Sequence, residues 1–320
     1  MIGLQLQREE LESQPRTTSY EVIVLGGGPG GLTAGLYASR AGLRTLLLEK
    51  QVPGGQVATT DLIENYPCCP EGISGSELMA RITAQARRFG LQTENAAVQG
   101  LTIDGDVRVV HTDRGDFQAR AVIIATGAHP AMIGVPGEEK FRSRGVSYCA
   151  TCDGPFYRDR TVAVVGGGDS AVQEALFLAR FAAKVVIIHR RETLRATAVL
   201  QERAFANPKI EFLWNRTVAA IEGGDAVERL ILQDTRTGVE SALAVDGVFV
   251  YVGQRPNTGF LRGVVALDPQ GYILTDEEMR TNVPGILAAG DVRRKTLRQM
   301  VTATGDGAVA AHSADLYLAG

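Results

Sequence analysis

Two cysteines separated by two residues carry the clearest chemistry in the chain. Cys149 and Cys152 are followed directly by Asp153. A C-x-x-C spacing can bring two sulfurs within bonding distance and lower the pKa of one thiol, which favours reversible disulfide exchange. Asp153 could donate and accept a proton for the thiolates, or it could simply be a turn residue. The motif therefore predicts a redox-active disulfide.

The same spacing also occurs in zinc sites and in pairs of buried, unreactive thiols. Tetrahedral zinc needs four ligands, and the sequence holds no second C-x-x-C and no H-x-x-x-H. Free cysteines are often interior, so inert thiols stay an alternative. The chain has 4 cysteines in 320 residues, which is too few for a disulfide scaffold, and the other two, Cys68 and Cys69, are adjacent.

Two glycine-rich turns, each between a strand-like run and a helix-patterned run, could bind phosphate. In such a turn the backbone N–H groups approach a pyrophosphate, and the positive end of the helix dipole lies behind them. One match alone can be ordinary packing of a strand on a helix, but two matches in full context predict two dinucleotide sites. The positions that fit the fingerprints are Gly26, Gly28 and Gly31 in the first turn, and Gly166, Gly168 and Ala171 in the second.

The residue that ends the next strand distinguishes the two nucleotides. After the first turn it is Glu49, whose carboxylate can accept hydrogen bonds from ribose hydroxyls. The corresponding residue of the second copy is His189, followed by Arg190 and Arg191 and then by Arg195. Guanidinium groups bind a 2′-phosphate, so the second site is predicted to bind NADPH. The first site is predicted to bind a dinucleotide without that phosphate. The alternative is a solvated basic stretch.

A dithiol exchanges electrons in pairs with a carrier. NADPH passes a hydride but does not readily reduce a disulfide by itself, so a flavin between the two is the natural relay. The first dinucleotide is therefore expected to be FAD.

The sequence repeats itself, which indicates two α/β units of one architecture. Each copy runs strand, glycine turn, helix, strand, hairpin and closing strand. The matching segments are 21–25 and 161–165, 45–49 and 184–189, 107–119 and 227–242, and 121–127 and 247–253. After Gly253 one more strand and a helix complete the first unit, so the second unit is predicted to be inserted into the first.

This organisation predicts two Rossmann-like nucleotide-binding domains. The boundaries are an N-terminal extension at 1–19, an FAD-binding domain at 20–127 and 255–320, and an NADPH-binding domain with the dithiol at 130–252. Gly and Pro at both crossings between the domains permit a hinge.

Composition excludes some partners and locations. With 33 Lys+Arg, 36 Asp+Glu and a net charge of −3, no nucleic-acid or membrane partner is expected. The first twenty residues lack the apolar run of a secretory signal, and no later run approaches the roughly 18 apolar residues of a membrane span. A soluble, cytoplasmic protein is expected.

From about Tyr20 to its C-terminus, the chain resembles the low-molecular-weight, NADPH-dependent thioredoxin reductases, which are FAD-containing pyridine nucleotide-disulfide oxidoreductases. The motifs that carry the resemblance are Gly26-Gly-Gly-Pro-Gly-Gly31, Pro53-Gly-Gly-Gln56, Glu64-Asn-Tyr-Pro67, Ala125-Thr-Gly127, Cys149-Ala-Thr-Cys-Asp-Gly154, Gly166-Gly-Gly-Asp-Ser-Ala171, His189-Arg-Arg191 with Arg195, Ala289-Gly-Asp-Val292 and Arg298-Gln-Met-Val-Thr-Ala303.

The resemblance implies roles for individual residues. Cys152 would face the flavin, Cys149 would attack the protein substrate, and Asp153 would be the acid that serves both. The substrate would be thioredoxin or a thioredoxin-like protein, and the enzyme would be a homodimer. Contacts to FAD would come from Glu49 through Gln56, Asn65, Asp291, Arg298, Gln299 and Met300, and contacts to NADPH from Ser170, His189, Arg190, Arg191 and Arg195.

The chain departs from the family after Pro67. Cys68 and Cys69 stand where the family usually has a glycine, and they are either unremarkable thiols or a second redox relay. The competing functions are a related flavin oxidoreductase that uses ferredoxin or oxygen, and a non-catalytic flavin redox sensor. The intact second fingerprint, basic cluster and dithiol argue against both.

Overall fold

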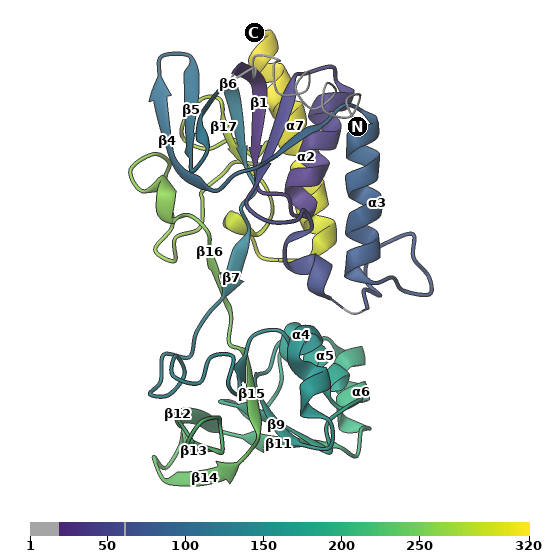
Figure 1. Ribbon diagram of the computed structural model, residues 1–320, viewed down its shortest axis with the longest axis vertical. Helices are drawn as coiled ribbons and strands as arrows, with labels where there is room; N and C mark the ends of the chain where they lie inside the picture. Colours follow the sequence, from purple (N-terminus) through teal and green to yellow (C-terminus); the bar gives the residue numbers. More distant parts are fainter. Residues whose placement is uncertain (1–18, 61) are drawn as a thin grey trace, which may run out of the picture. The chain divides into compact units, whose positions relative to one another are not determined.

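The computed structural model describes residues 19–60 and 62–320, and the chain divides into two compact units (Figure 1). Unit 1 combines the described residues up to Ala58 with Leu62–Gly127 and Pro256–Gly320, and unit 2 is chiefly Ala128–Arg255. The predicted insertion of one unit into the other is therefore confirmed. The expected N-terminal extension lies outside the described residues, except for Ser19, which begins the first strand.

Unit 1 is built on a seven-stranded sheet in the order β3-β2-β1-β6-β5-β4. The start of β6 forms an antiparallel hairpin with β5, and its end pairs in parallel with β17. The strands are β1 (Ser19–Leu25), β2 (Thr45–Glu49), β3 (Gln92–Asn95), β4 (Val98–Asp104), β5 (Val107–Thr112), β6 (Gly115–Ile124) and β17 (Ile286–Ala288). The helices are α2 (Pro29–Arg40), α3 (Gly75–Arg88) and α7 (Met300–Ala319), with short 3-10 turns η1 (Gly55–Thr59), η3 (Gly259–Leu261) and η4 (Gly290–Val292).

Both faces of this sheet are covered, because successive residues of its central strands are apolar and point to opposite faces. Val22 and Val24 of β1 pack with the helices α2, α3 and α7, which lie together on one face (Figure 1). Ile23 and Leu25 pack on the other face, against the β4–β5 hairpin and the chain between residues 261 and 292.

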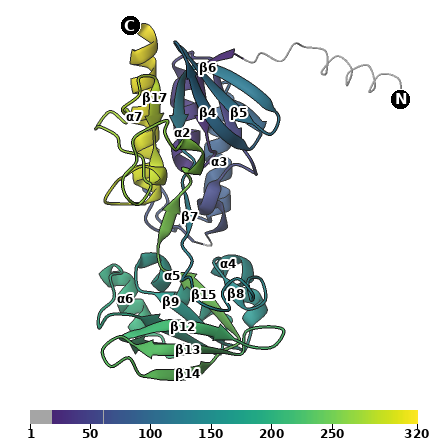
Figure 2. The same ribbon diagram turned by 90° about the vertical axis from the view of Figure 1, so that its left-hand side faces the viewer.

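Unit 2 repeats this plan with a five-stranded parallel sheet in the order β11-β10-β9-β15-β8. Helices α5 and α6 lie on one side of it, and a three-stranded antiparallel sheet, β12-β13-β14, lies on the other (Figure 2). The strands are β8 (Val146–Ser147), β9 (Thr161–Gly166), β10 (Lys184–His189), β11 (Ile210–Trp214), β12 (Arg216–Glu222), β13 (Arg229–Asp234), β14 (Glu240–Ala244) and β15 (Gly247–Tyr251). The helices are α4 (Ala150–Asp153), α5 (Asp169–Leu178) and α6 (Ala198–Phe205), with the 3-10 turn η2 (Gly154–Tyr157).

The predicted repeat is confirmed by strand order. The order β3-β2-β1-β6 in unit 1 matches β11-β10-β9-β15 in unit 2, and in both units the glycine turn follows the central strand β1 or β9. This is the order of a Rossmann-like nucleotide-binding unit, and the fold class is as predicted. The two chain crossings, β7 (Ala128–Pro130) and β16 (Gln254–Pro256), pair with each other as a short ribbon.

None of the helices within residues 19–60 and 62–320 is both long and apolar enough to cross a bilayer.

Candidate functional site

The first glycine turn joins β1 to α2 with a backbone that only glycine tolerates at two positions. Gly26 has a φ of +102°, and a Cβ there would lie 2.5 Å from the Ala125 carbonyl oxygen. A Cβ on Gly31 would lie 1.9 Å from the Gly26 carbonyl oxygen. Gly28, at the N-cap of α2, has open space around it instead, and no side chain caps the helix. The first N–H groups of α2 are thus left for a ligand such as pyrophosphate.

Glu49 holds this turn in place. Its Oε2 accepts a hydrogen bond from the Gly27 N–H at 2.7 Å, and its Oε1 accepts one from the Gln51 N–H at 3.0 Å. A carboxylate has about four acceptor positions, so capacity remains for ribose hydroxyls. The sequence predicted that Glu49 would bind ribose hydroxyls, but it did not predict the hydrogen bonds from the Gly27 and Gln51 N–H groups.

Asp291 and Arg298 carry buried polar atoms that have no partner among the described residues. These atoms are Oδ1 of Asp291 and Nε of Arg298, whose guanidinium lies 4.1 Å from the Tyr272 ring centroid. Burial raises the pKa of Asp291, and the nearby positive charges of Lys295 and Arg298 oppose that rise. Buried polar atoms are nearly always hydrogen-bonded, so these two fit the hydroxyl and acceptor groups of a bound dinucleotide.

Close packing brings the segment of Asp291 to the first glycine turn. A Cβ on Gly30, within α2, would lie 3.6 Å from the Gly290 Cα. A Cβ on Gly55, which precedes the exposed Gln56, would lie 3.3 Å from the Gly28 Cα. Segments from three distant parts of the sequence therefore meet at the start of α2.

Asn65 and Gln299 also meet, although they are 234 residues apart. The Asn65 Nδ2 donates to the Gln299 Oε1 at 3.1 Å. Gln299 is the N-cap of α7 and forms a capping box with Thr302, while Met300 is buried at the first turn of that helix. The predicted residues Asn65, Gln299 and Met300 therefore form one group in unit 1.

A buried acid that the sequence analysis missed supports this region. Asp306 of α7 accepts hydrogen bonds from the Gly290 N–H at 3.0 Å and from Lys295 Nζ at 2.7 Å, and it pairs with Arg293 at 3.4 Å. These bonds fix the segment that carries Asp291. The available signal was an acid between two glycines, Gly305 and Gly307, near the start of a largely apolar helical run.

The second glycine turn repeats the first. Gly166 has a φ of +152°, and a Cβ there would lie 2.5 Å from the Tyr251 carbonyl oxygen and 2.8 Å from the Cβ of Ala171. Gly168 is the N-cap of α5, with open space around it and no side-chain cap. Ser170 is exposed in the first turn of that helix.

His189 packs against this second turn. A Cβ on Gly167 would lie 2.4 Å from the His189 Nδ1, so the ring fills the space that glycine leaves. Its Nε2 is buried and has no partner among the described residues. Burial lowers the pKa of His189, and the charges of Arg195 and Arg191 lower it further. The His189 ring is therefore neutral at pH 7, and its Nε2 is left without a partner among the described residues.

Three exposed arginines follow His189 in the chain and are available for an anion. Arg190, Arg191 and Arg195 are exposed. The Arg195 N–H donates to the Gly167 carbonyl oxygen at 2.7 Å, which fixes its backbone beside the turn. No ion pair joins these guanidinium groups to a carboxylate in the part of the chain that the structure describes. They therefore keep their donors for a phosphate.

Cys149 and Cys152 form a disulfide at the start of α4. The Cys149 Sγ accepts a hydrogen bond from the Cys152 N–H at 3.2 Å, and Cys152 is exposed. The Asp153 N–H donates to the Cys149 carbonyl oxygen at 3.1 Å, so Asp153 is held within the same turn. Among the described residues no group of three or more His, Cys, Asp or Glu side chains could hold a metal ion.

Two residues that the sequence analysis missed position the disulfide. The Tyr251 hydroxyl accepts from the Ala150 N–H at 2.9 Å, and the Ser147 hydroxyl accepts from the Cys149 N–H at 3.1 Å. Tyr251 also pairs with Gly166 in the sheet, so the disulfide helix and the second glycine turn are tied to the same strand end. The signal for Tyr251 was a phenol ring with a hydroxyl group within the apolar run 247–253.

Comparisons with known proteins agree with this arrangement. A model of the pyridine nucleotide-disulphide oxidoreductase family matches residues 20–307. The chain is 48% identical over 300 residues to the thioredoxin reductase of Bacillus subtilis (strain 168), covering 93% of this chain and 95% of that one.

Solved structures agree as well. A crystal structure of Lactococcus lactis thioredoxin reductase in its FR conformation has a TM-score of 0.92 and 44% identity, covering 94% of this chain and 99% of that one. The T. acidophilum thioredoxin reductase has a TM-score of 0.89 and 34% identity, covering 94% and 98%. The chain therefore belongs to the pyridine nucleotide-disulphide oxidoreductase family, in the branch of the thioredoxin reductases.

Proposed function

We propose that this protein is an NADPH-dependent, FAD-containing thioredoxin-disulfide reductase that acts on thioredoxin or a thioredoxin-like protein. The observation that carries the proposal is the Cys149–Cys152 disulfide, tied through Tyr251 to a glycine turn with three unpaired arginines around it. A disulfide built onto a nucleotide-binding unit is what nucleotide-driven disulfide reduction requires. The activity suits the cytoplasm, where thiols are kept reduced.

Unit 1 would hold FAD. Its pyrophosphate would lie at the uncapped start of α2, with ribose hydroxyls on Glu49, and Asp291 and Arg298 would pair their unpartnered atoms with it. The neighbouring predicted contacts are Gln56, Asn65, Gln299 and Met300. When bound, FAD supplies a carrier that accepts a hydride from a nicotinamide and delivers two electrons to a disulfide.

Unit 2 would hold NADPH through its own turn. The uncapped start of α5 would bind the pyrophosphate, with Ser170 beside it. Arg190, Arg191 and Arg195 would bind the 2′-phosphate, and the neutral His189 would offer its buried nitrogen to the adenosine end.

The reduced dithiol would act on the partner by exchange. The Cys149 sulfur accepts a hydrogen bond from the Cys152 N–H, and Cys149 is the attacking thiolate. It forms a mixed disulfide with one sulfur of the partner's disulfide, and the other partner sulfur leaves as a thiolate. Cys152 then attacks Cys149, the second partner sulfur leaves, and the chain's disulfide forms again. Asp153 would donate and accept the protons of these steps. Phe156 follows closely and is 82% exposed, so it offers an apolar contact to a protein substrate.

The visible spectrum under anaerobic conditions tests this function. The protein should be yellow as purified, and two equivalents of NADPH per chain should bleach it, one for the disulfide and one for the flavin, while NADH bleaches it far more slowly. Thioredoxin disulfide added to the bleached protein should restore the colour. A yellow protein that NADPH fails to bleach would indicate a different electron donor and contradict the proposal.

Replacing Asp291 with asparagine should separate stability from cofactor binding. The flavin-free protein should gain about 2 °C or more in Tm, because a buried, unpaired carboxylate becomes a neutral amide. Retention of FAD should fall about tenfold, because a bond to a charged acceptor is lost. Tm of the flavin-free form and FAD dissociation constants measure the two effects. Asp104→Asn, at an exposed acid of β4, should change neither, and an unchanged FAD affinity in Asp291→Asn would remove Asp291 from the site.

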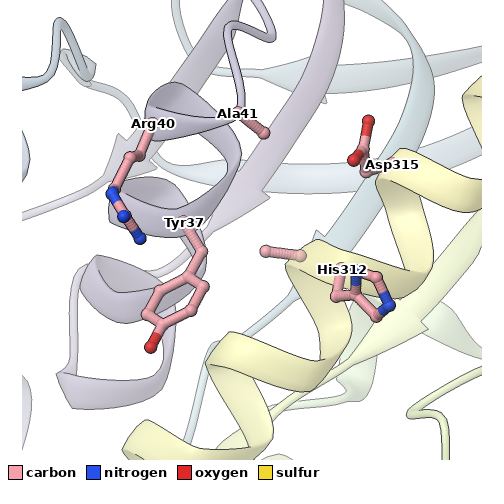
Figure 3. A pocket seen from close by; sticks show the side chains of 6 residues that line it. Tyr37, Arg40, Ala41, His312 and Asp315 are labelled. Carbon is pink, nitrogen blue, oxygen red and sulfur yellow. The ribbon is translucent and has the colours of Figure 1, made fainter.

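The face of α2 and α7 is proposed as a homodimer contact. Tyr37 and Arg40 from α2 and His312 and Asp315 from α7 line a hollow of about 240 Å³ (Figure 3). Leu316 on the same helix is 53% exposed. The hollow is lined mainly by polar and charged side chains and the apolar Leu316 is exposed on the same helix, a mixture that suits an interface with a second copy of the chain.

Leu316→Glu should therefore convert the dimer to a monomer, because it places a charge where the proposed contact has an exposed apolar side chain. Light scattering after size exclusion should give twice 34.2 kDa for the wild type and 34.2 kDa for the variant. Ile103→Glu, at a comparably exposed residue of β4, should remain dimeric. A Leu316→Glu variant that stays dimeric would exclude this face as the homodimer contact.

A further inference from the structure

Cys68 and Cys69 form a second thiol pair in unit 1, apart from the redox disulfide of unit 2. Their sulfurs lie 3.7 Å apart and are not bonded. Neighbouring side chains of an extended strand point to opposite sides, but Cys68 has a φ of +86°, a backbone that residues with side chains rarely adopt. With this conformation both sulfurs lie on one side, close to each other.

The chain around the pair is held in place. Pro67 and Pro70 flank it and fix their own φ angles, and the Gly72 N–H donates to the Cys69 carbonyl oxygen at 3.0 Å. An antiparallel bridge between Ile63 and Ile73 closes the loop. The two sulfurs are thus positioned before any ligand arrives, which lowers the entropy lost on binding.

The two thiols differ in environment. Cys68 is exposed, while Cys69 is partly buried against the core of unit 1. Burial, followed by the hydrogen bond with Cys68, raises the pKa of Cys69. Because oxidation and exchange begin from a thiolate, the raised pKa disfavours a reaction that starts at Cys69 in a second redox relay.

We propose that Cys68 and Cys69 together chelate one thiophilic centre that needs only two sulfur ligands, the chemical class being trivalent arsenicals with a single organic substituent. A centre bonded to each sulfur at about 2.3 Å, the zinc–thiolate length, with a bond angle between about 90° and tetrahedral, sets the sulfurs roughly 3.3–3.8 Å apart. The observed 3.7 Å lies at the upper end of this range, so the sulfurs need to approach by only a few tenths of an ångström at most. Zinc itself would need further ligands, and the described residues offer no third one.

The binding step is a condensation. Two arsenic–sulfur bonds form, the arsenic–oxygen double bond breaks, and the two thiol protons leave with that oxygen as one water. Arsenic stays trivalent and both sulfurs keep their oxidation state, so no oxidant or reductant takes part.

Phenylarsine oxide and intact-protein mass spectrometry test the site on the full-length protein with Cys149–Cys152 kept oxidised. One adduct per chain is expected, with the mass of the reagent less one water, and peptide mapping should place it on the segment of Cys68 and Cys69. The adduct should survive washing with a monothiol and be removed by a 1,2-dithiol, because a chelate has two bonds to exchange.

Matched variants identify the ligands. Cys68→Ser and Cys69→Ser should each lose the wash-resistant adduct, whereas the Cys149→Ser, Cys152→Ser double variant should keep it, which makes the test independent of the proposed reductase activity. Failure of the oxidised wild type to take up one adduct would overturn the proposal. So would an adduct that persists through monothiol washing in either single variant, or a Cys68–Cys69 disulfide that must be reduced before binding occurs.

Discussion

Cys152→Ser is expected to stop NADPH-dependent reduction of thioredoxin while leaving reduction of the flavin by NADPH intact. Turnover should fall about a thousandfold or more, because a single remaining thiol can form a mixed disulfide with the partner but cannot resolve it. The nucleotide sites are unaffected, since among the described residues the Cys152 side chain bonds only to the Cys149 sulfur, and the Cys152 N–H that donates to that sulfur survives the substitution. Steady-state assays measure the reduction of thioredoxin, and anaerobic bleaching by NADPH measures the reduction of the flavin separately.

Matched variants make this result specific. Cys149→Ser should lose turnover equally and should also fail to trap a mixed disulfide with thioredoxin, whereas Cys152→Ser should accumulate one. The Cys68→Ser, Cys69→Ser double variant should turn over normally, because that pair lies outside the proposed electron path. Turnover of Cys152→Ser above a tenth of the wild type would contradict the mechanism, and loss of turnover in the Cys68, Cys69 variant would restore the second-relay hypothesis.

The fold could be predicted from the sequence where one strand, one glycine turn and one helix follow each other with clear periodicity. β1 and β9 are continuous apolar runs because parallel strands are buried on both faces, and each leads into a glycine at which a Cβ would collide with backbone. Repetition of that pattern was enough to predict two units of one architecture, and their matching strand orders confirm it.

Strands without that periodicity were not predicted. β12 carries a bulge between Val218 and Ala220, so its buried residues Val218 and Ile221 are three apart rather than two. β4 buries only Leu101, so it shows no apolar alternation at all. In both strands the partner across the sheet, and not the local pattern, determines the structure.

The residues of the candidate site also divide into those that the local sequence pattern predicts and those that it does not. Glu49 and the residues around His189 were found because a dinucleotide needs them at a fixed place after the glycine turn. Asp306 and Tyr251 were missed because they act through backbone groups, the Gly290 N–H and the Ala150 N–H, that are far away in sequence. Only the fold brings such pairs together.

Replacing both Arg190 and Arg191 with alanine is expected to raise the KM for NADPH about a hundredfold and to leave the KM for NADH nearly unchanged. Both guanidinium groups are exposed, and no carboxylate among the described residues competes for them, so each is free to bind the 2′-phosphate. Exposure screens the interaction, so about 1.4 kcal/mol per arginine, or tenfold each, is the appropriate scale. The kcat should stay close to that of the wild type, because neither residue contacts the disulfide.

Salt and a control arginine distinguish this binding role from a structural one. Raising the ionic strength should increase the KM for NADPH of the wild type and have little effect on the double variant, since its phosphate contacts are already gone. Arg229→Ala, which removes an exposed arginine paired with Glu222 in the three-stranded sheet of the same unit, should leave the KM values for both nucleotides unchanged. Equal losses for NADPH and NADH in the double variant would show that the arginines support the fold of the site rather than select the phosphate, and the assignment of this unit to NADPH would then rest on the resemblance alone.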